Sequence, residues 1–463
     1  MHRAMTAYWS EFRRDLASLI AIRSVAAPGG TVPGQPYGEA CAQALDWILS
    51  RAREMELRVE NIGGYAGHAE WGEGEDYCAA LAHLDVVPAG FGWTAPPFSL
   101  DERGGRLYGR GTADDKGAAL AALYCLWRLK ENGVVGKRKI RVIFGCGEEC
   151  GMEDMKHYFA REPLPVFAFT PDSDYTVCNR EKGILQVKYS GPGETGGVVS
   201  EFCAGAAVNA VPDCAQATVC CSPEERQHLR EESGAASPVR WELEEGEDGL
   251  SITAYGKASH AMSPQEGVNA ATHLIDLLYR VFGGRIGKTL TMLKERVERE
   301  TTGERLGIAC ADEPSGALTL NLGTVTVNRR CSVFTMDIRY PVMADGGGIL
   351  DRLRQEAGRW KRELSVIHHL PPIYLPPDSP LIRLLVDAYE EVSGEKARIY
   401  ATGGGTYART LNGRGVAFGP IFPDQDDPAI HKPDEHIVIG RFQTHMEICY
   451  EAMRRMMGWD GEE

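Results

Sequence analysis

The stretch YCAALAHLDVVP, residues 77–88, organises the rest of this chain. Its apolar run at 78–82 is typical of a buried strand, and Pro88 indicates that the strand has ended. Side chains two residues apart share one face of a strand, so we expect His83 and Asp85 to point together into a crevice at the strand end. A neutral imidazole binds zinc, and a carboxylate beside it fixes its tautomer. Taken alone, the pair fits an ordinary strand-end turn equally well, so the interpretation depends on finding further ligands.

Helices and strands alternate around this stretch. Apolar residues at helical spacing predict helices over 5–24, 38–57 and 117–131. Short apolar runs predict strands over 56–62, 78–82, 139–145 and 166–170. Such alternation is typical of an α/β domain whose mostly parallel sheet is covered by helices on both faces.

The pattern changes to closely spaced strands between residues 181 and 377. We expect strands over 184–190, 199–206, 215–221, 250–256, 317–327 and 332–340, with helices over 266–282 and 348–358. Short connections such as Asn328-Arg-Arg330 indicate hairpins, and hence an antiparallel α+β insert. A helix from 380 and a Gly-rich loop at 403–405 resume the α/β style. The sequence therefore predicts a catalytic domain of residues 1–180 and 378–463, interrupted by a lid domain of residues 181–377.

Composition narrows the class of protein. A chain of 463 residues is expected to form two or three domains, and 43% hydrophobic with 25% charged residues is typical of a soluble protein. The net charge of −15 argues against a nucleic-acid surface. No apolar run is long enough for a signal peptide or a membrane span. The thirteen cysteines form no CxxC pair, so reduced thiols of a cytoplasmic protein are expected rather than a disulfide framework.

Five histidine or acidic positions fall at strand ends or in tight loops: His83, Asp114, Glu149, Asp172 and His431. Each alone has an ordinary explanation as a turn, a helix start or a surface loop. Ligands of open α/β sheets nevertheless gather outside the carboxyl ends of strands, where three of these five are expected. Two imidazoles and three carboxylates, without a thiolate, suit two divalent ions that share one carboxylate.

Five motifs in a fixed order carry a resemblance to a known family. The order HLDVVP, GRGTADDKG, GEECG, TPDSD and AIHKPDEH resembles the co-catalytic di-zinc metallopeptidase family of carnosinase, aminoacylase and carboxypeptidase G. Further stretches, AVNAVPD (207–213), GKASHAMSPQEGVNAA (256–271), DIRYP (337–341) and GGGTYAR (403–409), are most similar to its peptidase V-type dipeptidase branch. The resemblance implies a zinc-peptidase-like α/β domain with an inserted α+β lid, and a metal-dependent dipeptidase acting on small peptides. It also implies two divalent ions, zinc or alternatively manganese or cobalt.

The resemblance assigns a role to each of the five metal-binding candidates. It implies that His83 and Asp172 bind one metal, that Glu149 and His431 bind the other, and that Asp114 bridges the two. The water between the metals would then attack the scissile carbonyl of a dipeptide.

Catalytic and substrate-binding residues follow from the same motifs. Glu148 is implied as the general base, Asp85 as the partner of His83, and His260 of the lid as the group that holds the oxyanion. The implied substrate-binding residues are Asn209, Arg339, Gly404, Gly405 and Thr406. The loop at 403–405 could also cradle a phosphate, but it lacks the Lys-Ser/Thr of a P-loop, so backbone amides that bind a substrate carboxylate are preferred.

Two departures and two alternatives complete the interpretation. Gly147 stands where relatives commonly carry Asp, which removes a local hydrogen bond. Cys146 and Cys150 flank the paired glutamates as redox-sensitive or simply packed thiols.

The long insert resembles the branch that works as a monomer. An N-acyl-amino-acid deacylase would keep every metal ligand. An inactive binding protein would not need Glu148, so its retention favours an enzyme.

Overall fold

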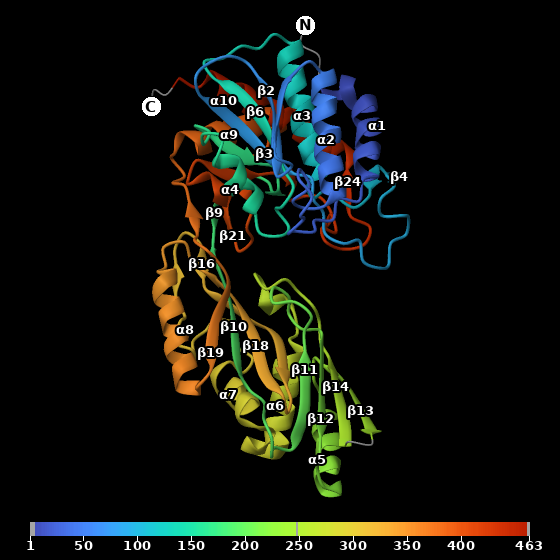
Figure 1. Ribbon diagram of the computed structural model, residues 1–463, viewed down its shortest axis with the longest axis vertical. Helices are drawn as coiled ribbons and strands as arrows, with labels where there is room; N and C mark the ends of the chain where they lie inside the picture. The colour runs from blue at the N-terminus through green and yellow to red at the C-terminus, as the bar shows by residue number, and fades with distance from the viewer. Residues whose placement is uncertain (1–4, 247–248, 461–463) are drawn as a thin grey trace. The chain divides into compact units, whose positions relative to one another are not determined.

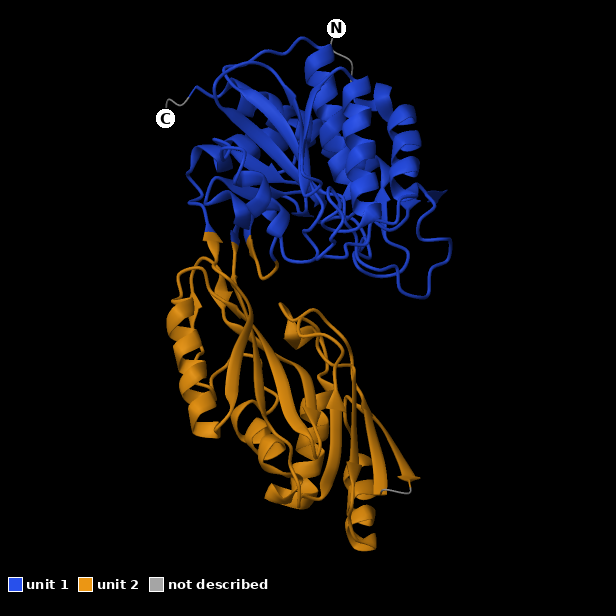
Figure 2. Ribbon diagram, in the orientation of Figure 1, with its two compact units in different colours: residues 1–180, 374–400, 405–463 blue, residues 181–373, 401–404 orange. Residues whose placement is uncertain are grey.

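The computed structural model describes residues 5–246 and 249–460, and its chain divides into two compact units (Figure 2). Unit 1 comprises Met1–Arg180, Tyr374–Tyr400 and Gly405–Glu463, and unit 2 comprises Glu181–Ile373 and Ala401–Gly404. Each unit has its own apolar core.

Unit 1 contains a mixed sheet with parallel strands at its centre. The first seven strands in order are β1 (Arg58–Ile62), β2 (Ala66–Trp71), β6 (Lys139–Gly145), β3 (Tyr77–His83), β7 (Ala168–Thr170), β22 (Gly415–Phe418) and β9 (Val177–Glu181). The short strands β20 (Ile373–Tyr374) and β21 (Ile399–Thr402) both pair with β9. The four strands from β6 to β22 are mutually parallel, whereas β1, β2 and β9 pair antiparallel. The predicted α/β class is confirmed, with parallel pairing concentrated where the candidate ligands lie.

Helices cover both faces of this sheet, and α1, α2 and α3 can be followed beside β3 in Figure 1. The helical segments of unit 1 are η1 (Met5–Tyr8), α1 (Trp9–Ile20), α2 (Glu39–Glu54), α3 (Lys116–Glu131), α4 (Glu153–Phe159), α9 (Pro380–Ser393), η4 (Tyr407–Leu411) and α10 (Ile439–Gly458). Its short strands are β4 (Asp101–Arg103), β5 (Arg106–Tyr108), β8 (Ser173–Asp174), β23 (Pro420–Ile421) and β24 (His436–Val438). The two short strands β20 and β21 contain residues of both units. Strand β24 pairs with β5, which connects the C-terminal part of the chain to the loop before α3.

Consecutive residues of β3 face two different cores. Ala80 and Ala82 belong to the large core formed with α1, α2, α3, α9 and α10, whereas Ala79 and Leu81 belong to a smaller core with α4 and η4. His83 continues the second series because side chains alternate along a strand. Its ring meets that of Tyr407 edge-on, with the centroids 6.2 Å apart. The two-residue period of β3 therefore decides which way the first candidate ligand points.

Unit 2 is built on an antiparallel sheet of eight strands. Their order is β13 (Arg240–Gly246), β14 (Gly249–Tyr255), β12 (Cys214–Val219), β11 (Val199–Ala204), β17 (Thr319–Val327), β18 (Cys331–Tyr340), β10 (Gly183–Pro192) and β19 (Glu363–Leu370). The predicted hairpin at 328–330 joins β17 to β18 and is confirmed. The other elements are α5 (Pro223–Ser233), η2 (Pro264–Glu266), α6 (Ala270–Phe282), η3 (Gly283–Ile286), α7 (Lys288–Arg296), β15 (Ala311–Asp312), β16 (Gly316–Ala317) and α8 (Gly346–Trp360).

Helix α6 shows how local chemistry sets a boundary in unit 2. The pattern predicts a helix from 266, but α6 begins at Ala270 because the Asn269 side chain accepts a hydrogen bond from the Thr272 N–H and caps the helix there. Its buried residues Leu274, Leu277 and Leu278 then pack in the core of the unit.

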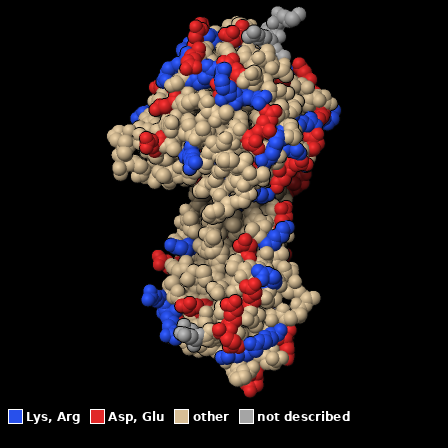
Figure 3. Space-filling view, turned by 90° about the vertical axis from the view of Figure 1, so that its right-hand side faces the viewer, with Lys and Arg blue, Asp and Glu red and all other residues tan. Residues whose placement is uncertain are grey.

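Surface charge, cysteine pairing and helix apolarity can be compared with the predictions made from composition. On the face of each unit seen in Figure 3, acidic and basic side chains are intermixed, so opposite charges lie close together there. All thirteen cysteines are free, and six of them are buried. Within the described ranges, no helix has both the length and the apolarity needed to cross a bilayer.

Replacing Leu81 by Ala tests the smaller core. Leu81 is fully buried there, so the variant should lose about 2–5 kcal/mol of unfolding free energy through lost burial and a residual cavity. Urea denaturation of the metal-free chain measures this. Val135→Ala, at a side chain that is 78% exposed, should leave the denaturation midpoint unchanged. Equal midpoints for the two variants would contradict the assignment of Leu81 to a packed core.

Candidate metal centre

Five separate segments of unit 1 supply the candidate ligands. His83 ends β3, Asp114 lies just before α3, Glu149 follows β6, Asp172 follows β7, and His431 lies in the loop before β24. Three of these positions follow the carboxyl ends of adjacent parallel strands, which place them at one edge of the sheet.

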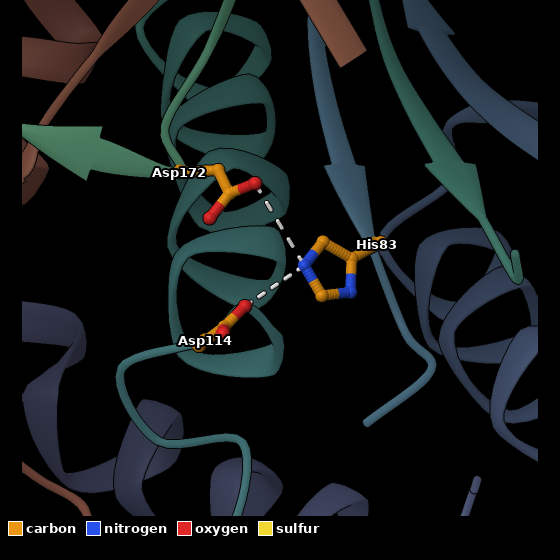
Figure 4. Close-up of side chains that lie close together, drawn as sticks. All are labelled: His83, Asp114 and Asp172. Carbon is orange, nitrogen blue, oxygen red and sulfur yellow. Dashed lines mark ion pairs between the residues drawn. The ribbon is translucent and has the colours of Figure 1, made fainter. Parts of the chain in front are cut away.

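The side chains form two groups that share Asp114 (Figure 4 shows the first). His83 Nε2 lies 2.9 Å from Asp114 Oδ1 and 3.9 Å from Asp172 Oδ2. His431 Nε2 lies 2.9 Å from Asp114 Oδ2 and 3.0 Å from Glu149 Oε1. Within each group the ligand atoms lie within 4.8 Å of one another. Asp114 therefore directs one oxygen to each histidine, which is the arrangement of a carboxylate that bridges two cations.

The protonation of His83 fits a metal ligand. Its Nδ1 lies 2.9 Å from the backbone oxygen of Asp85 and 3.4 Å from a carboxylate oxygen of the same residue, so this nitrogen carries the proton. Nε2 faces the carboxylate oxygens of Asp114 and Asp172. This buried nitrogen has no hydrogen-bond partner among the described residues. Burial acts to lower the pKa of His83, but Asp114 and Asp85 outweigh it and raise this pKa well above its ordinary value. The carboxylates around Nε2 favour a positive charge at this position, which a bound cation can supply in place of a proton, so the residues fit a divalent metal.

Electrostatics support the same conclusion. Burial raises the pKa of Asp172 well above its ordinary value, and the charge of Asp114 raises it further. Burial and Asp114 also raise the pKa of Glu149. For Asp114 burial acts in the same direction, but His431 and His83 outweigh it, and the pKa is lowered. Acidic groups crowded in this way repel one another until positive charge is supplied, which favours cation binding.

Glu148 lies next to the ligand Glu149 but belongs to neither group. Its side chain is half-buried. Burial raises its pKa well above the ordinary value, followed by the negative charge of Asp172. A carboxylate of raised basicity that does not bind the metal is suited to take up and return a proton.

The loop of residues 146–149, which carries both glutamates, is held by two buried carboxylates. The first two N–H groups of the loop donate to Asp154 Oδ2 at 2.8 and 2.9 Å. The last two donate to the Asp85 carboxylate at 3.3 and 3.0 Å. Tyr407 also donates a hydrogen bond to Asp154. Besides standing next to His83, Asp85 thus fixes the backbone of the glutamate pair.

Close packing explains the glycine within this loop. A Cβ added at Gly147 would lie 2.5 Å from Cζ of Tyr37, so the Asp of relatives would not fit in this conformation. The Gly147 N–H is nevertheless hydrogen-bonded, to Asp154. Burial raises the pKa of the flanking thiols of Cys146 and Cys150, which disfavours reactive thiolates.

In unit 2, Asn209 and His260 lie on neighbouring backbone segments. The Ala261 N–H donates to the Asn209 carbonyl at 2.9 Å. His260 is exposed, and its Nδ1 accepts a hydrogen bond of 3.1 Å from the Met262 N–H. Nδ1 is thus the acceptor, so the proton of the neutral ring is on Nε2, which makes Nε2 a hydrogen-bond donor.

Arg339 is buried and firmly oriented within unit 2. Its Nε and Nη2 donate to the two oxygens of Asp337 at 2.6 and 2.9 Å, and Nη1 donates to the Gly403 carbonyl at 2.8 Å. A Cβ at Gly403 would lie 2.8 Å from Cβ of Met262, so this glycine permits a close approach. Arg339, Gly403 and the segment that carries His260 are therefore brought together in unit 2.

The remaining predicted substrate-binding residues lie where the chain passes from one unit to the other. Gly404 belongs to unit 2 and donates its N–H to Thr402 Oγ1 at 3.0 Å. Gly405 and Thr406 belong to unit 1. Thr406 is buried, and its hydroxyl accepts a hydrogen bond of 3.2 Å from the Ala408 N–H, which caps η4. In the structure this hydroxyl therefore has a local role.

Sequence reasoning missed three buried carboxylates beside the ligands: Asp115, Asp154 and Glu435. The only available signal was their position, within five residues of a predicted ligand or of Glu148–Glu149. Asp115 Oδ2 accepts a hydrogen bond of 3.1 Å from the backbone N–H of His83. These residues hold the loops that carry the ligands.

Two histidines and two carboxylates around a shared aspartate, with a further glutamate beside them, are typical of metal-dependent hydrolases that activate water. Residues 79–455 match the model of the peptidase family M20/M25/M40. The chain belongs to this family of metallopeptidases.

Relatives and solved structures agree with this assignment. The chain is 36% identical to the putative dipeptidase YtjP of Bacillus subtilis over 92% of its length and 93% of that relative. It is 32% identical to a Beta-Ala-Xaa dipeptidase of Lactobacillus delbrueckii subsp. lactis, over 95% of its length and 94% of the relative. The fold is similar to that of the dipeptidase Dug1p of Saccharomyces cerevisiae, with a TM-score of 0.60 and 14% identity over 98% and 97% of the two chains. Human carnosine dipeptidase 1 gives a TM-score of 0.58 and 14% identity over 98% of both chains.

Asp154→Ala tests the support of the glutamate loop. The substitution leaves three backbone N–H groups, two in the loop and that of Met155, and the Tyr407 hydroxyl without their acceptor, so unfolding free energy should fall by about 3 kcal/mol or more. Asp46→Ala is the matched control, because Asp46 is exposed and accepts only a 3.3 Å bond from the Asn61 amide. Urea denaturation of both variants gives the comparison. A loss no larger than that of the control would show that Asp154 does not hold the loop.

Proposed function

We propose that this chain is a dipeptidase that hydrolyses the peptide bond of small dipeptides with water activated between two divalent metal ions. The observation that carries the proposal is Asp114, which has one carboxylate oxygen 2.9 Å from each of the two histidines. Family membership and two relatives named as dipeptidases support the reaction type.

In this proposal the ligands divide as the two groups do. His83 and Asp172 would hold one ion, Glu149 and His431 would hold the other, and Asp114 would be shared by the two sites. Zinc suits a set of imidazoles and carboxylates, and manganese or cobalt is the alternative. When bound, such ions lower the pKa of water and polarise the scissile carbonyl.

Glu148 performs the proton transfers of this mechanism. Its carboxylate takes the proton of the attacking water, and the carbonyl carbon becomes tetrahedral as the C–O bond forms. Glu148 then donates that proton to the nitrogen of the leaving amine as the C–N bond breaks. The raised pKa of Glu148 in the metal-free chain suits both steps, and cations bound nearby would lower this pKa again.

The residues of unit 2 are proposed to bind the substrate. The Nε2–H of His260 would donate to the oxyanion, with Asn209 beside it. Arg339 uses three of its five N–H donors on Asp337 and Gly403, which holds the guanidinium rigidly while two donors remain for a substrate carboxylate. Gly404 of unit 2, and Gly405 and Thr406 of unit 1, are further proposed substrate-binding residues.

The proposal assigns one role to each domain. Residues 1–180 and 378–463 form the catalytic domain, and residues 181–377 form a lid that contributes His260 in the same chain. We further propose that the enzyme works as a monomer in the cytoplasm, since the insert is long and thirteen free cysteines suit a reducing compartment.

Glu148→Gln separates catalysis from metal binding. The variant should lose about 10²–10⁴-fold in kcat, the range for removing a general base. Its metal content, measured by elemental analysis, should stay at the two ions per chain proposed for the wild type. Glu149→Gln is the matched control at the next position and should lose an ion. Unchanged turnover in Glu148→Gln would exclude the base role, and loss of an ion would show that the two glutamates are exchanged in function.

A substrate panel distinguishes the dipeptidase from a deacylase of the same family. Ala-His should be cleaved well, whereas Ala-His-amide and Ala-Ala-Ala should be cleaved poorly, because they offer Arg339 no carboxylate at the right distance. Arg339→Ala should narrow the difference between Ala-His and its amide. N-acetyl-methionine is the deacylase probe. A higher kcat/KM for N-acetyl-methionine than for Ala-His would contradict the dipeptidase proposal and leave the metal centre unaffected.

A further inference from the structure

Glu435 is a buried carboxylate with an unusual number of backbone donors. It is fully buried, and its Oε1 accepts three hydrogen bonds from one loop. The donors are the N–H groups of Gly111, Ala113 and Asp114, at 3.0, 2.9 and 3.1 Å. Its Oε2 lies 2.6 Å from Nη1 of Arg110, which is also buried. A buried negative charge needs such compensation, so the loop at 110–114 and Glu435 stabilise each other.

Glu435 also belongs to the loop that carries His431. It lies four residues after this histidine, and its own carbonyl accepts a hydrogen bond of 3.0 Å from the Gly109 N–H. The next residue, His436, begins β24 and pairs with Tyr108 of β5. Side chain and backbone of one residue thus connect the segment that presents His431 with the segment that presents Asp114.

The bond to the Asp114 N–H acts on the residue shared by the two metal groups. Asp114 must direct one oxygen toward His83 and the other toward His431, so a small rotation of its backbone would weaken both contacts. The N–H groups at 111, 113 and 114 converge on one oxygen, which restricts that rotation.

We propose that Glu435 is a positioning residue of the metal centre, which sets the orientation of Asp114 and its distance from His431. The inference rests on the proposed two-metal site. Glu435 itself lies in neither ligand group. Its effect on the metals passes through the backbone of Asp114.

If Glu435 had only a structural role, its loss would lower stability without changing metal binding. Unit 2 contains a buried glutamate that serves as a matched control. Glu356 of α8 is also fully buried and paired with arginines, with Oε2 2.7 Å from Arg296 and Oε1 2.5 Å from Arg359. It has no connection to a candidate ligand. Glu356→Gln therefore removes a buried, arginine-paired charge without touching the loop of Asp114.

The experiment compares Glu435→Gln with Glu356→Gln and the wild type in the full-length, metal-free chain. Zinc and cobalt are titrated in competition with a chromophoric chelator to give the stoichiometry and Kd of each ion. The visible spectrum of the cobalt form reports the ligand geometry. Urea midpoints, and kcat and KM at saturating metal, are measured in parallel. If Glu435→Gln does not fold, Arg110→Met/Glu435→Gln takes its place, because it leaves no buried charge unpaired.

Glu435→Gln should raise the Kd of both ions about 10–100-fold, the usual effect of losing a group that orients metal ligands. Its cobalt spectrum should change and kcat should fall more than KM changes. Glu356→Gln should lose stability but keep the metal affinities and spectrum of the wild type. The inference would be overturned if Glu435→Gln had the same metal affinities and the same cobalt spectrum as Glu356→Gln. A wild-type chain that binds two ions yet leaves dipeptides intact would overturn the proposed function alone.

Discussion

Hydrogen bonds from backbone N–H groups to buried carboxylates hold the candidate metal centre together. Asp85 and Asp154 accept all four N–H groups of the loop at 146–149, and Glu435 accepts three from the loop before α3. Asp115 accepts the N–H of His83. Each buried charge is stabilised by the loop it holds, and each loop keeps its shape because of the charge. The ligands come from segments far apart in sequence, and these bonds give them a common frame.

Much of the fold could be predicted because the spacing of apolar residues along the sequence indicates which face of a helix or strand is buried. Strand β3 has a continuous apolar run at 78–82, the second half of β6 is apolar, and the short connection at 328–330 indicates a hairpin. Strand β2 was missed because its sequence, AGHAEW, is partly polar. Its polar residues are buried only because His68 bonds to the Tyr158 hydroxyl at 2.9 Å and Glu70 bonds to Arg141 at 2.6 Å. Helix α5 was missed because only Leu229 is buried, although the capping box of Ser222 and Glu225 was a local signal.

For the site, motifs identified side chains that could bind metal, and the structure brings five of them into two groups. Their roles stay predictions. The supporting carboxylates could not be recognised, because an isolated Glu or Asp in a polar loop gives no sign that it is buried. Glu435 becomes identifiable only when donors more than three hundred positions away converge on it. The pairing of Arg339 with Asp337 is a different case, since residues two apart on β18 share a face and the contact could have been expected.

The order of segments along the chain has a consequence for synthesis on the ribosome. Unit 2 has nearly all of its residues once Ile373 has emerged, whereas unit 1 still lacks β22, α10 and His431. Until then β7 has no parallel neighbour on one side, and the face of the sheet that packs against Met446 and Met453 is uncovered. During this interval the apolar layer of unit 1 is incomplete, and exposed apolar surface of this kind is prone to aggregation. His431 is the last of the five candidate ligands in chain order, so the group that it forms with Asp114 and Glu149 cannot be complete before this segment has been made.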